Sequence, residues 1–304
     1  MNTTSSSTPH LHPTSGERAL VLAGGGAAGN AWVLGVIAGL SDAGVDVVDA
    51  DVVIGTSSGS TVAAQITGDT PPAALYTSIL AEAPTAADRG SAGARAPILS
   101  GQSYLDWSNA IIASSADPSD MRRRIGAAAL ERDAADGSPT RWREIVAARL
   151  PNAHWPQQRV LITAVDARSG EPVVFDRDSG VELVDAVAAS TSAMTPYRIG
   201  ENRYLNGSYR RGENADLALG YRRVLVLVPF GGRSRMPATW GMDLATQVAE
   251  LRAAGSRVET IVPDATTADL FDANALDPAT RQRAARGGYD QGRTLAASLA
   301  GFWR

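Results

Sequence analysis

A serine flanked by glycines carries the clearest chemistry in this sequence. The segment Gly55-Thr56-Ser57-Ser58-Gly59 has the G-x-S-x-G spacing of a nucleophile elbow, a sharp strand-to-helix turn that projects a hydroxyl. The small residues Gly55 and Gly59 leave room for the turn and for a substrate. The amino end of the following helix adds backbone N–H groups, which favour a developing negative charge. The spacing therefore predicts Ser57 as an acyl-transfer nucleophile and the N–H of Ser58 as an oxyanion donor.

A second glycine-rich segment, Gly24–Gly29, can supply the other part that acyl transfer needs. It reads GGGAAG and follows an apolar run. Because glycine has no Cβ, the N–H groups of Gly24, Gly25 and Gly26 can approach a carbonyl oxygen closely. Removing one such donor typically slows an enzyme by about 100- to 1000-fold. This turn, which Gly29 completes, is therefore the candidate oxyanion hole.

The same glycines fit a second interpretation. The spacing Gly24-x-Gly26-x-x-Gly29 also satisfies the fingerprint of dinucleotide-binding folds. Acidic residues near the position that would bind a ribose are Asp46, Asp49 and Asp51. Against this interpretation, the second strand carries Ser57 at its end, where such a fold would place its ribose-binding acid. Dinucleotide binding stays open here as the more distant alternative.

Composition excludes several chemistries. Of 304 residues, 44% are hydrophobic, and the net charge of −4 implies no basic face for nucleic acid. All 28 cationic residues are arginine and there is no cysteine, which excludes Schiff-base lysines, disulfides and thiolate nucleophiles. A Ser-His-Asp triad would have to use His154, because His10 and His12 lie in a Ser/Thr/Pro-rich start. His154 is expected to be structural or at the surface, and no metal or cofactor is expected.

The first seventy residues alternate strand and helix patterns. Apolar runs predict strands at Arg18–Ala23 and Asp51–Ile54, and helical spacing predicts helices at Asn30–Ala43 and Ser60–Gln65. Each strand runs into a glycine turn and then a helix. This is the pattern of an α/β fold, with a parallel sheet covered by helices.

The strand pattern disappears between about residues 70 and 156. We therefore expect a helical insertion or lid beside the site, with helices at Met121–Arg132 and Arg141–Leu150 and loops at 91–100 and 134–140. Later elements are predicted as strands at Arg159–Val165, Pro172–Phe175 and Arg223–Val228, and as helices at Val181–Ala189 and Pro278–Phe302.

Residues 17–304 are expected to form one domain, preceded by a disordered tail at residues 1–16. The tail lacks the basic and continuous apolar regions of a secretory signal. No apolar run approaches the roughly 20 residues that span a bilayer. The default expectation is a cytoplasmic protein of unknown oligomeric state.

At these positions the sequence resembles the patatin-like phospholipase family. The resemblance spans about Leu20 to Phe230 and includes similar segments at 163–171 and 189–196. Its three ordered motifs are Gly24-Gly25-Gly26-x-x-Gly29, Gly55-x-Ser57-x-Gly59 and, where the family has Asp-Gly-Gly/Ala, Asn206-Gly207-Ser208. The resemblance implies a three-layer α/β/α sandwich with a mainly parallel sheet, and a Ser-Asp dyad that needs no histidine.

The resemblance also implies roles for these residues. Ser57 would form an acyl-enzyme from an acyl ester or lipid, and the amides of Gly25 and Gly26 would form most of the oxyanion hole. The expected partner is that substrate, with room for a transient contact with a membrane surface. An acyltransferase or cyclase on the same fold is an alternative, because the sequence does not distinguish water from another acceptor.

Two positions depart from the family pattern. Ala28 stands where the family often has Arg or Lys, which removes one positive charge near the oxyanion. Asn206 falls on the dyad acid, and an amide can orient Ser57 but is too weak a base to take its proton. The exchange is either engineered or a natural loss of hydrolysis. The chain is then a disabled or trapped hydrolase, or a catalytically silent binding module; without the resemblance, Asn206-Gly207 reads as an ordinary turn.

Further residues could compensate for Asn206 or contact a lipid. Acids that could replace the missing base are Asp166, Asp185, Glu213 and Asp216. The run Arg122-Arg123-Arg124 is expected to be a solvated helix face. Tryptophans in or beside the insertion are expected to pack in a core, or alternatively to shape an acyl pocket: Trp107, Trp142 and Trp155.

Overall fold

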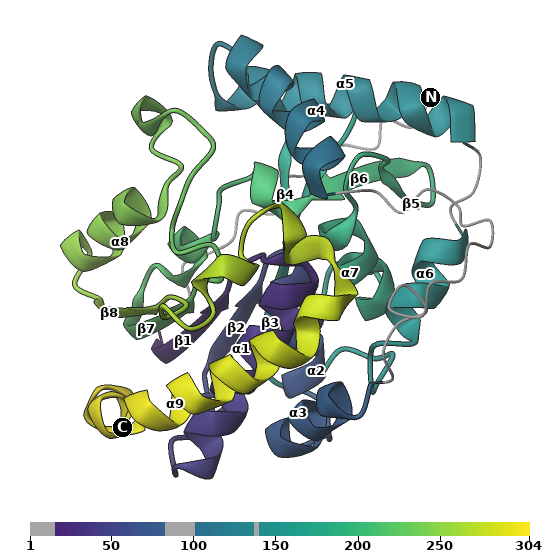
Figure 1. The fold of residues 1–304 in the computed structure, drawn as a ribbon. Helices are drawn as coiled ribbons and strands as arrows, with labels where there is room; N and C mark the ends of the chain where they lie inside the picture. Colours follow the sequence, from purple (N-terminus) through teal and green to yellow (C-terminus); the bar gives the residue numbers. More distant parts are fainter. Residues whose placement is uncertain (1–15, 83–100, 137–139) are drawn as a thin grey trace.

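The computed structural model describes residues 16–82, 101–136 and 140–304, and a mostly parallel sheet of eight strands forms its centre (Figure 1). The strand order is β5-β6-β3-β2-β1-β7-β8, and β4 pairs with β3. The strands are β1 (Gly16–Leu22), β2 (Val52–Gly55), β3 (Arg159–Asp166), β4 (Pro172–Phe175), β5 (Tyr197–Ile199), β6 (Asn202–Asn206), β7 (Tyr221–Leu227) and β8 (Arg257–Ile261).

Strand pairing changes from parallel to antiparallel at β3. Strands β3, β2, β1, β7 and β8 are parallel to their neighbours in that order, whereas β4 and β6 run antiparallel to β3. The carboxyl ends of β1 and β2 therefore meet at one edge of the sheet. The antiparallel β6 also ends there, because Asn206 pairs with Ala164 while Gly55 pairs with Ile162, both on β3.

Helices cover both faces of the sheet, which gives three layers. One face packs against α1 (Gly26–Asp42), α2 (Ser58–Ile66), α7 (Leu183–Thr191) and α9 (Arg281–Trp303), and Figure 1 shows α9 lying along α1. The other face packs against α8 (Leu244–Ala253) and the short helix η2 (Ala215–Ala218). The expected three-layer α/β/α sandwich with a mainly parallel sheet is confirmed.

A third apolar cluster lies beside β3 and β6. It joins α4 (Gly101–Ser114) and α5 (Pro118–Asp136) to the last residues of both strands, through side chains that include Met121, Ile125 and Leu205. In the described residues between β2 and β3, every regular element is a helix, since α3 (Pro72–Leu80) and α6 (Thr140–Ala147) complete the segment. A lid function for this segment stays a prediction.

Several element boundaries differ from the sequence prediction. Helix α1 begins at Gly26 rather than Asn30, so most of the glycine turn is its first helical turn. Strand β1 begins at Gly16, inside the expected tail. The prediction missed β5, which has three residues, and β8, which buries only Val258 and Ile261 and so shows no apolar run. It also missed β6, α3, α4 and α8, and its loop at 91–100 lies outside the described residues.

Across the described residues, no helix combines the length and apolar character needed to cross a bilayer.

Candidate active site

Ser57 lies at the sharp turn between β2 and α2. Its backbone has φ 52° and ψ −127°, a region that non-glycine residues rarely adopt and that costs roughly 1–3 kcal/mol. The flanking glycines are required by close packing: a Cβ on Gly59 would lie 2.1 Å from the backbone oxygen of Leu22, and one on Gly55 would lie 2.6 Å from the Cα of Ser60. The fold therefore holds one strained serine at the carboxyl edge of the sheet.

Asn206 is the side-chain partner of Ser57. It is buried at the end of β6, and its Nδ2 donates a 3.0 Å hydrogen bond to Ser57 Oγ. Its Oδ1 accepts a 3.0 Å hydrogen bond from the backbone N–H of Ser208. The second bond fixes the amide orientation, because a flipped amide would set its NH₂ group against the Ser208 N–H.

This arrangement leaves the Ser57 hydroxyl without a proton acceptor on Asn206. The amide donates to the hydroxyl oxygen, and an amide nitrogen of this kind is not a base. A carboxylate of the same shape would accept from both Ser208 N–H and Ser57 O–H. The position therefore has the geometry of a general base and the chemistry of a hydrogen-bond donor.

Backbone N–H groups near Ser57 come from two helix starts. Within the described residues, the N–H groups of Gly26 and Ser58, the first residues of α1 and α2, have no hydrogen-bond partner. The N–H of Gly25 is already bonded, since it donates to Ser58 Oγ at 2.9 Å. Gly24 faces the serine, because a Cβ there would lie 3.0 Å from Ser57 Cβ. The unpaired amides of Gly26 and Ser58 are therefore candidate oxyanion donors.

Ser190 is a site residue that the sequence did not reveal. This fully buried serine on α7 accepts a 2.9 Å hydrogen bond from the backbone N–H of Ser57. The bond ties the strained elbow to a neighbouring helix. It also removes the Ser57 N–H from the set of oxyanion donors. The available signal was weak: one small polar residue within the apolar helix α7.

Comparison with known proteins identifies the family. The model of the family described as patatin-like phospholipase matches residues 20–219. The chain belongs to the patatin-like phospholipase family. Its members are lipid acyl hydrolases, and the family motifs in this chain are the segments that meet around Ser57. No curated protein matches this sequence.

Two solved structures show wider similarity to this patatin-like chain. VipD from Legionella pneumophila matches over 93% of this chain and 67% of its own, with 14% sequence identity and a TM-score of 0.43. The type III effector protein ExoU matches over 92% of this chain and 54% of its own, with 19% identity and a TM-score of 0.34. This chain thus spans about half the length of ExoU.

None of the proposed substitute acids contacts Ser57 within the described part of this patatin-like domain. Asp166 accepts from the N–H groups of a turn, and Asp185 binds Arg143 and the Tyr197 hydroxyl. Asp216 forms a two-point ion pair with Arg210. These carboxylates are engaged elsewhere.

Glu213 differs from these three acids in its environment, although it does not contact Ser57 either. Its carboxyl is buried, and that burial raises its pKa to about 7. The 3.0 Å hydrogen bond that it accepts from Gln247 Nε2 lowers the pKa and so partly offsets the burial. Nearby Asp243 also raises this pKa and Arg211 lowers it. Glu213 is thus a titratable group behind the site rather than a base within it.

Other residues singled out in the sequence lie away from the patatin-like site. His154 is exposed in a connector. Trp142 and Trp155 donate to backbone oxygens of Ala188 and Val181, and Trp107 packs against the cluster beside β3. In the arginine run, the second and third arginines pair with Asp120, while the first donates to the backbone oxygen of Gly170.

The dinucleotide interpretation requires an acid beside the glycine turn to bind a ribose, and neither Asp49 nor Asp51 lies there. Asp51 precedes β2 and accepts from the backbone N–H groups of Glu17 and Arg18, at the amino end of the strands. Asp49 pairs with Arg18 at the same end. The glycine turn of Gly24–Gly29 lies at the opposite, carboxyl end. No observation therefore favours a ribose site beside these glycines.

Proposed function

We propose that this chain is a patatin-like lipid acyl hydrolase in which Ser57 is the nucleophile and Asn206 occupies the position of the base. The proposal is carried by one observation: the Asn206 amide donates to Ser57 Oγ at 3.0 Å while Ser208 N–H holds its other end. A carboxylate would fit this place, and the amide that fills it accepts no proton. Turnover of acyl esters by the chain as it stands is therefore expected to be slow.

The reaction requires a proton acceptor at its first step. Ser57 Oγ attacks the acyl carbonyl carbon, its proton passes to the residue at position 206, and the oxyanion is stabilised by the amides of Gly26 and Ser58. Collapse expels the alcohol, which takes up that proton and leaves acyl-Ser57. Water then attacks the acyl group with the same residue as base. A positioned general base raises the reaction rate by about 100- to 10,000-fold, and an amide at position 206 does not supply this increase.

A second candidate follows from the same hydrogen bond. Because Asn206 donates to the hydroxyl that would attack, the site is suited to hold an acyl ester without cleaving it. The chain would then be a catalytically silent lipid-binding module. Both candidates use the same backbone donors, and they differ in whether the native chain hydrolyses the bound ester.

The deciding experiment compares the chain with its Asn206→Asp variant. Both are treated with a fluorophosphonate and with a p-nitrophenyl ester, and the adduct is located by peptide mass. We expect Asn206→Asp to raise ester hydrolysis by about 100- to 10,000-fold and to label Ser57. Labelling that appears only in the Asp form would identify the native chain as silent, whereas slow labelling of the native chain would identify a weak hydrolase.

Three controls make this experiment specific. Asn202→Asp makes the same chemical change at the exposed start of β6 and should leave the activity unchanged. Ser57→Ala in the Asn206→Asp background should abolish both labelling and hydrolysis. Intact mass of the native chain must show that Asn206, which precedes a glycine, has not deamidated. Absence of Ser57 labelling in both forms would refute the proposal.

A further inference from the structure

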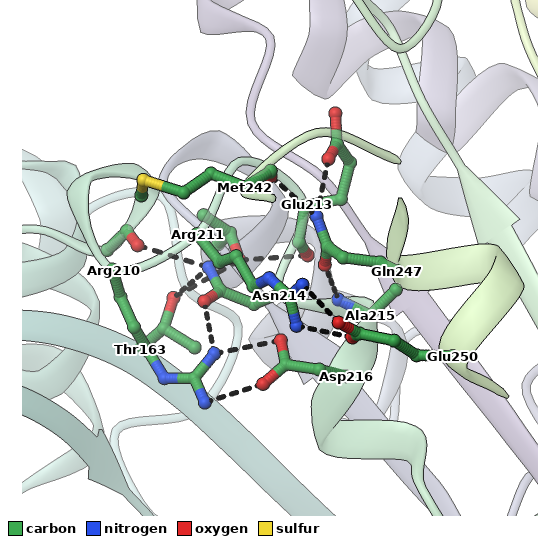
Figure 2. A network of polar contacts seen from close by, with 12 residues as sticks. Thr163, Arg210, Arg211, Glu213, Asn214, Ala215, Asp216, Met242, Gln247 and Glu250 are labelled. Atoms are coloured by element: carbon green, nitrogen blue, oxygen red, sulfur yellow. Dashed lines mark hydrogen bonds and ion pairs between the residues drawn. The ribbon is translucent and has the colours of Figure 1, made fainter. Parts of the chain in front are cut away.

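A buried amide, Asn214, lies at the centre of a polar network (Figure 2). It bonds to Thr56 and Gly207, the chain neighbours of Ser57 and Asn206. Among the described non-glycine residues, only Ser57 and Asn214 have a positive φ, at 52° and 58° respectively. The backbone of Ser57 is strained and must be held by its surroundings, whereas Asn214 lies in the left-handed region that asparagine tolerates. The two residues are linked, because Asn214 bonds to Thr56, the neighbour of Ser57.

The Asn214 NH₂ group joins the segments that carry both members of the pair. Its Nδ2 donates to Thr56 Oγ1 at 2.9 Å and to the backbone oxygen of Gly207 at 3.1 Å. Thr56 precedes Ser57, and Gly207 follows Asn206. A third contact, with Thr163 Oγ1 of β3, lies at 3.3 Å. One amide thus contacts three segments: the turn that carries Ser57, strand β3, and the turn that follows Asn206.

The other end of the Asn214 amide is held by charge. Its Oδ1 accepts a 2.8 Å hydrogen bond from Arg210 Nη1. Arg210 is fixed in turn by two hydrogen bonds to the carboxylate of Asp216, at 3.0 and 2.8 Å, as Figure 2 shows. The guanidinium can only donate, so Nδ2 must face Thr56 and Gly207. The left-handed backbone that Asn tolerates directs the side chain into this place.

We propose that Asn214 is a positioning residue that sets the distance between Ser57 Oγ and the side chain at position 206. Its catalytic consequence rests on the proposed function, whereas its geometric consequence does not. Without the Nδ2 donors, the turns carrying Ser57 and Asn206 lose their shared anchor and can separate. Displacements well below 1 Å matter, since a misplacement of about 1 Å can cost 100-fold in rate.

Gln247 provides a matched control in the same network. It is equally buried, and its Nε2 donates to Glu213 Oε2 and to the backbone oxygen of Met242, both at 3.0 Å. Its Oε1 accepts from the N–H of Ala215. Gln247 bonds to neither Thr56 nor Gly207. A loss of its donors therefore tests the stability of the network without releasing the catalytic pair.

The first test measures catalysis in the Asn206→Asp background. Asn214→Asp removes the two donors while keeping the shape and the left-handed backbone, and Gln247→Glu is the equivalent change at the control position. We expect Asn214→Asp to lower kcat about 30-fold or more with KM within 3-fold, and Gln247→Glu to leave kcat within 3-fold. Asn214→Gly, which keeps the backbone conformation, replaces Asn214→Asp if the latter does not fold. An equal kcat in both variants would overturn the proposal.

The second test needs no activity and uses the native Asn206. Asn-Gly deamidation begins when the Gly207 nitrogen attacks Asn206 Cγ, expelling ammonia, and water then opens the ring to a carboxylate. Attack requires the ψ of Asn206 to leave its value of 131°, which the bond from Asn214 to Gly207 opposes. We expect Asn214→Asp to deamidate at Asn206 at least 3-fold faster than Gln247→Glu. Equal rates would overturn the positioning role, whereas unlabelled Ser57 in the Asn206→Asp background would refute only the proposed hydrolase.

Discussion

The proposed catalytic pair, Ser57 and Asn206, and the network around Asn214 differ in what their hydrogen bonds achieve. In front, Ser57 Oγ has one hydrogen bond, from an amide that takes no proton. Behind, Asn214 satisfies both ends of its amide and joins three segments. Within the described residues, no buried side-chain nitrogen or oxygen lacks a partner. The buried polar groups that support the site are therefore all satisfied, whereas Ser57 has a hydrogen-bond donor, and no proton acceptor, at position 206.

The comparison indicates that the position of a side chain and its ability to accept a proton depend on different features of the sequence. An amide and a carboxylate have nearly the same shape, and Ser208 N–H is satisfied by either one at position 206. The contacts that place the residue at position 206 therefore fit an amide and a carboxylate equally well. Variants that act behind the pair should damage geometry, and variants in front should damage rate.

The largest expected effect comes from Gly207→Ala, which breaks the supporting side. A Cβ at Gly207 would lie 2.1 Å from Thr163 Oγ1 and 2.3 Å from the backbone oxygen of Thr163. The turn that carries Asn206 must then move away from β3. We expect a loss of about 3 kcal/mol or more in urea unfolding, because overpacking against backbone has no soft neighbour to absorb it.

Gly212→Ala is the control for this change. A Cβ at Gly212 would meet only the backbone oxygen of Met242, at 3.6 Å, in the same loop. Its unfolding free energy should stay within about 0.5 kcal/mol of the parent chain. If Gly207→Ala is equally well tolerated, the close packing of the Asn206 turn on β3 does not hold in solution.

Glu213 adds a pH dependence to the supporting side. Its pKa of about 7 lies above the unfolded value of 4.5, so the folded state binds the proton more tightly. Stability from this group is complete below pH 4.5 and is lost as the pH rises through 7, by an amount on the order of 3 kcal/mol. Glu213→Gln should remove this loss.

The measurement is urea unfolding at pH 4.5 and pH 8. The parent chain should lose more stability between the two than Glu213→Gln, and at pH 8 the variant should be the more stable of the two. Asp243 and Arg211 also face this carboxyl, with opposite effects on its pKa. Parallel pH profiles for the two proteins would show that Glu213 titrates as an exposed carboxyl.

Local sequence patterns predicted the turn between β2 and α2 that carries Ser57. Gly55 and Gly59 signalled the turn because such glycines are needed where backbone meets backbone, as the contact of Gly59 with Leu22 shows. The β-turn-α order around Gly24–Gly29 likewise predicted the parallel sheet. Helix α1 nevertheless begins within those glycines, because packing of the turn overrides their poor helix propensity.

The support could not be predicted in the same way. Ser190 and Ser57 are separated by 133 positions, and Asn214 and Thr56 by 158. No local spacing relates such residues, and a single buried polar residue leaves no periodic pattern. Asn206 itself was found only through the family resemblance, because Asn-Gly alone indicates an ordinary turn. Its partnership depends on the register of β6 on β3, which turn composition does not encode.

The smallest expected effect comes from Gly24→Ala, which acts on the front of the site alone. A Cβ there would lie 3.0 Å from Ser57 Cβ and 3.6 Å from Ser57 Oγ, while the backbone of Gly24 lies outside the left-handed region. The nucleophile should therefore shift by a few tenths of an ångström and the fold should not. In the Asn206→Asp background we expect kcat/KM to fall about 10- to 100-fold, which corresponds to roughly 1–3 kcal/mol, with an unchanged unfolding midpoint. Gly301→Ala, with open space around its Cβ on α9, should leave kcat/KM unchanged and should not lower the unfolding midpoint, because alanine favours a helix more than glycine does. A Gly24→Ala protein that unfolds much earlier would mean that the front of the site also supports the fold, contrary to the separation of position from reactivity.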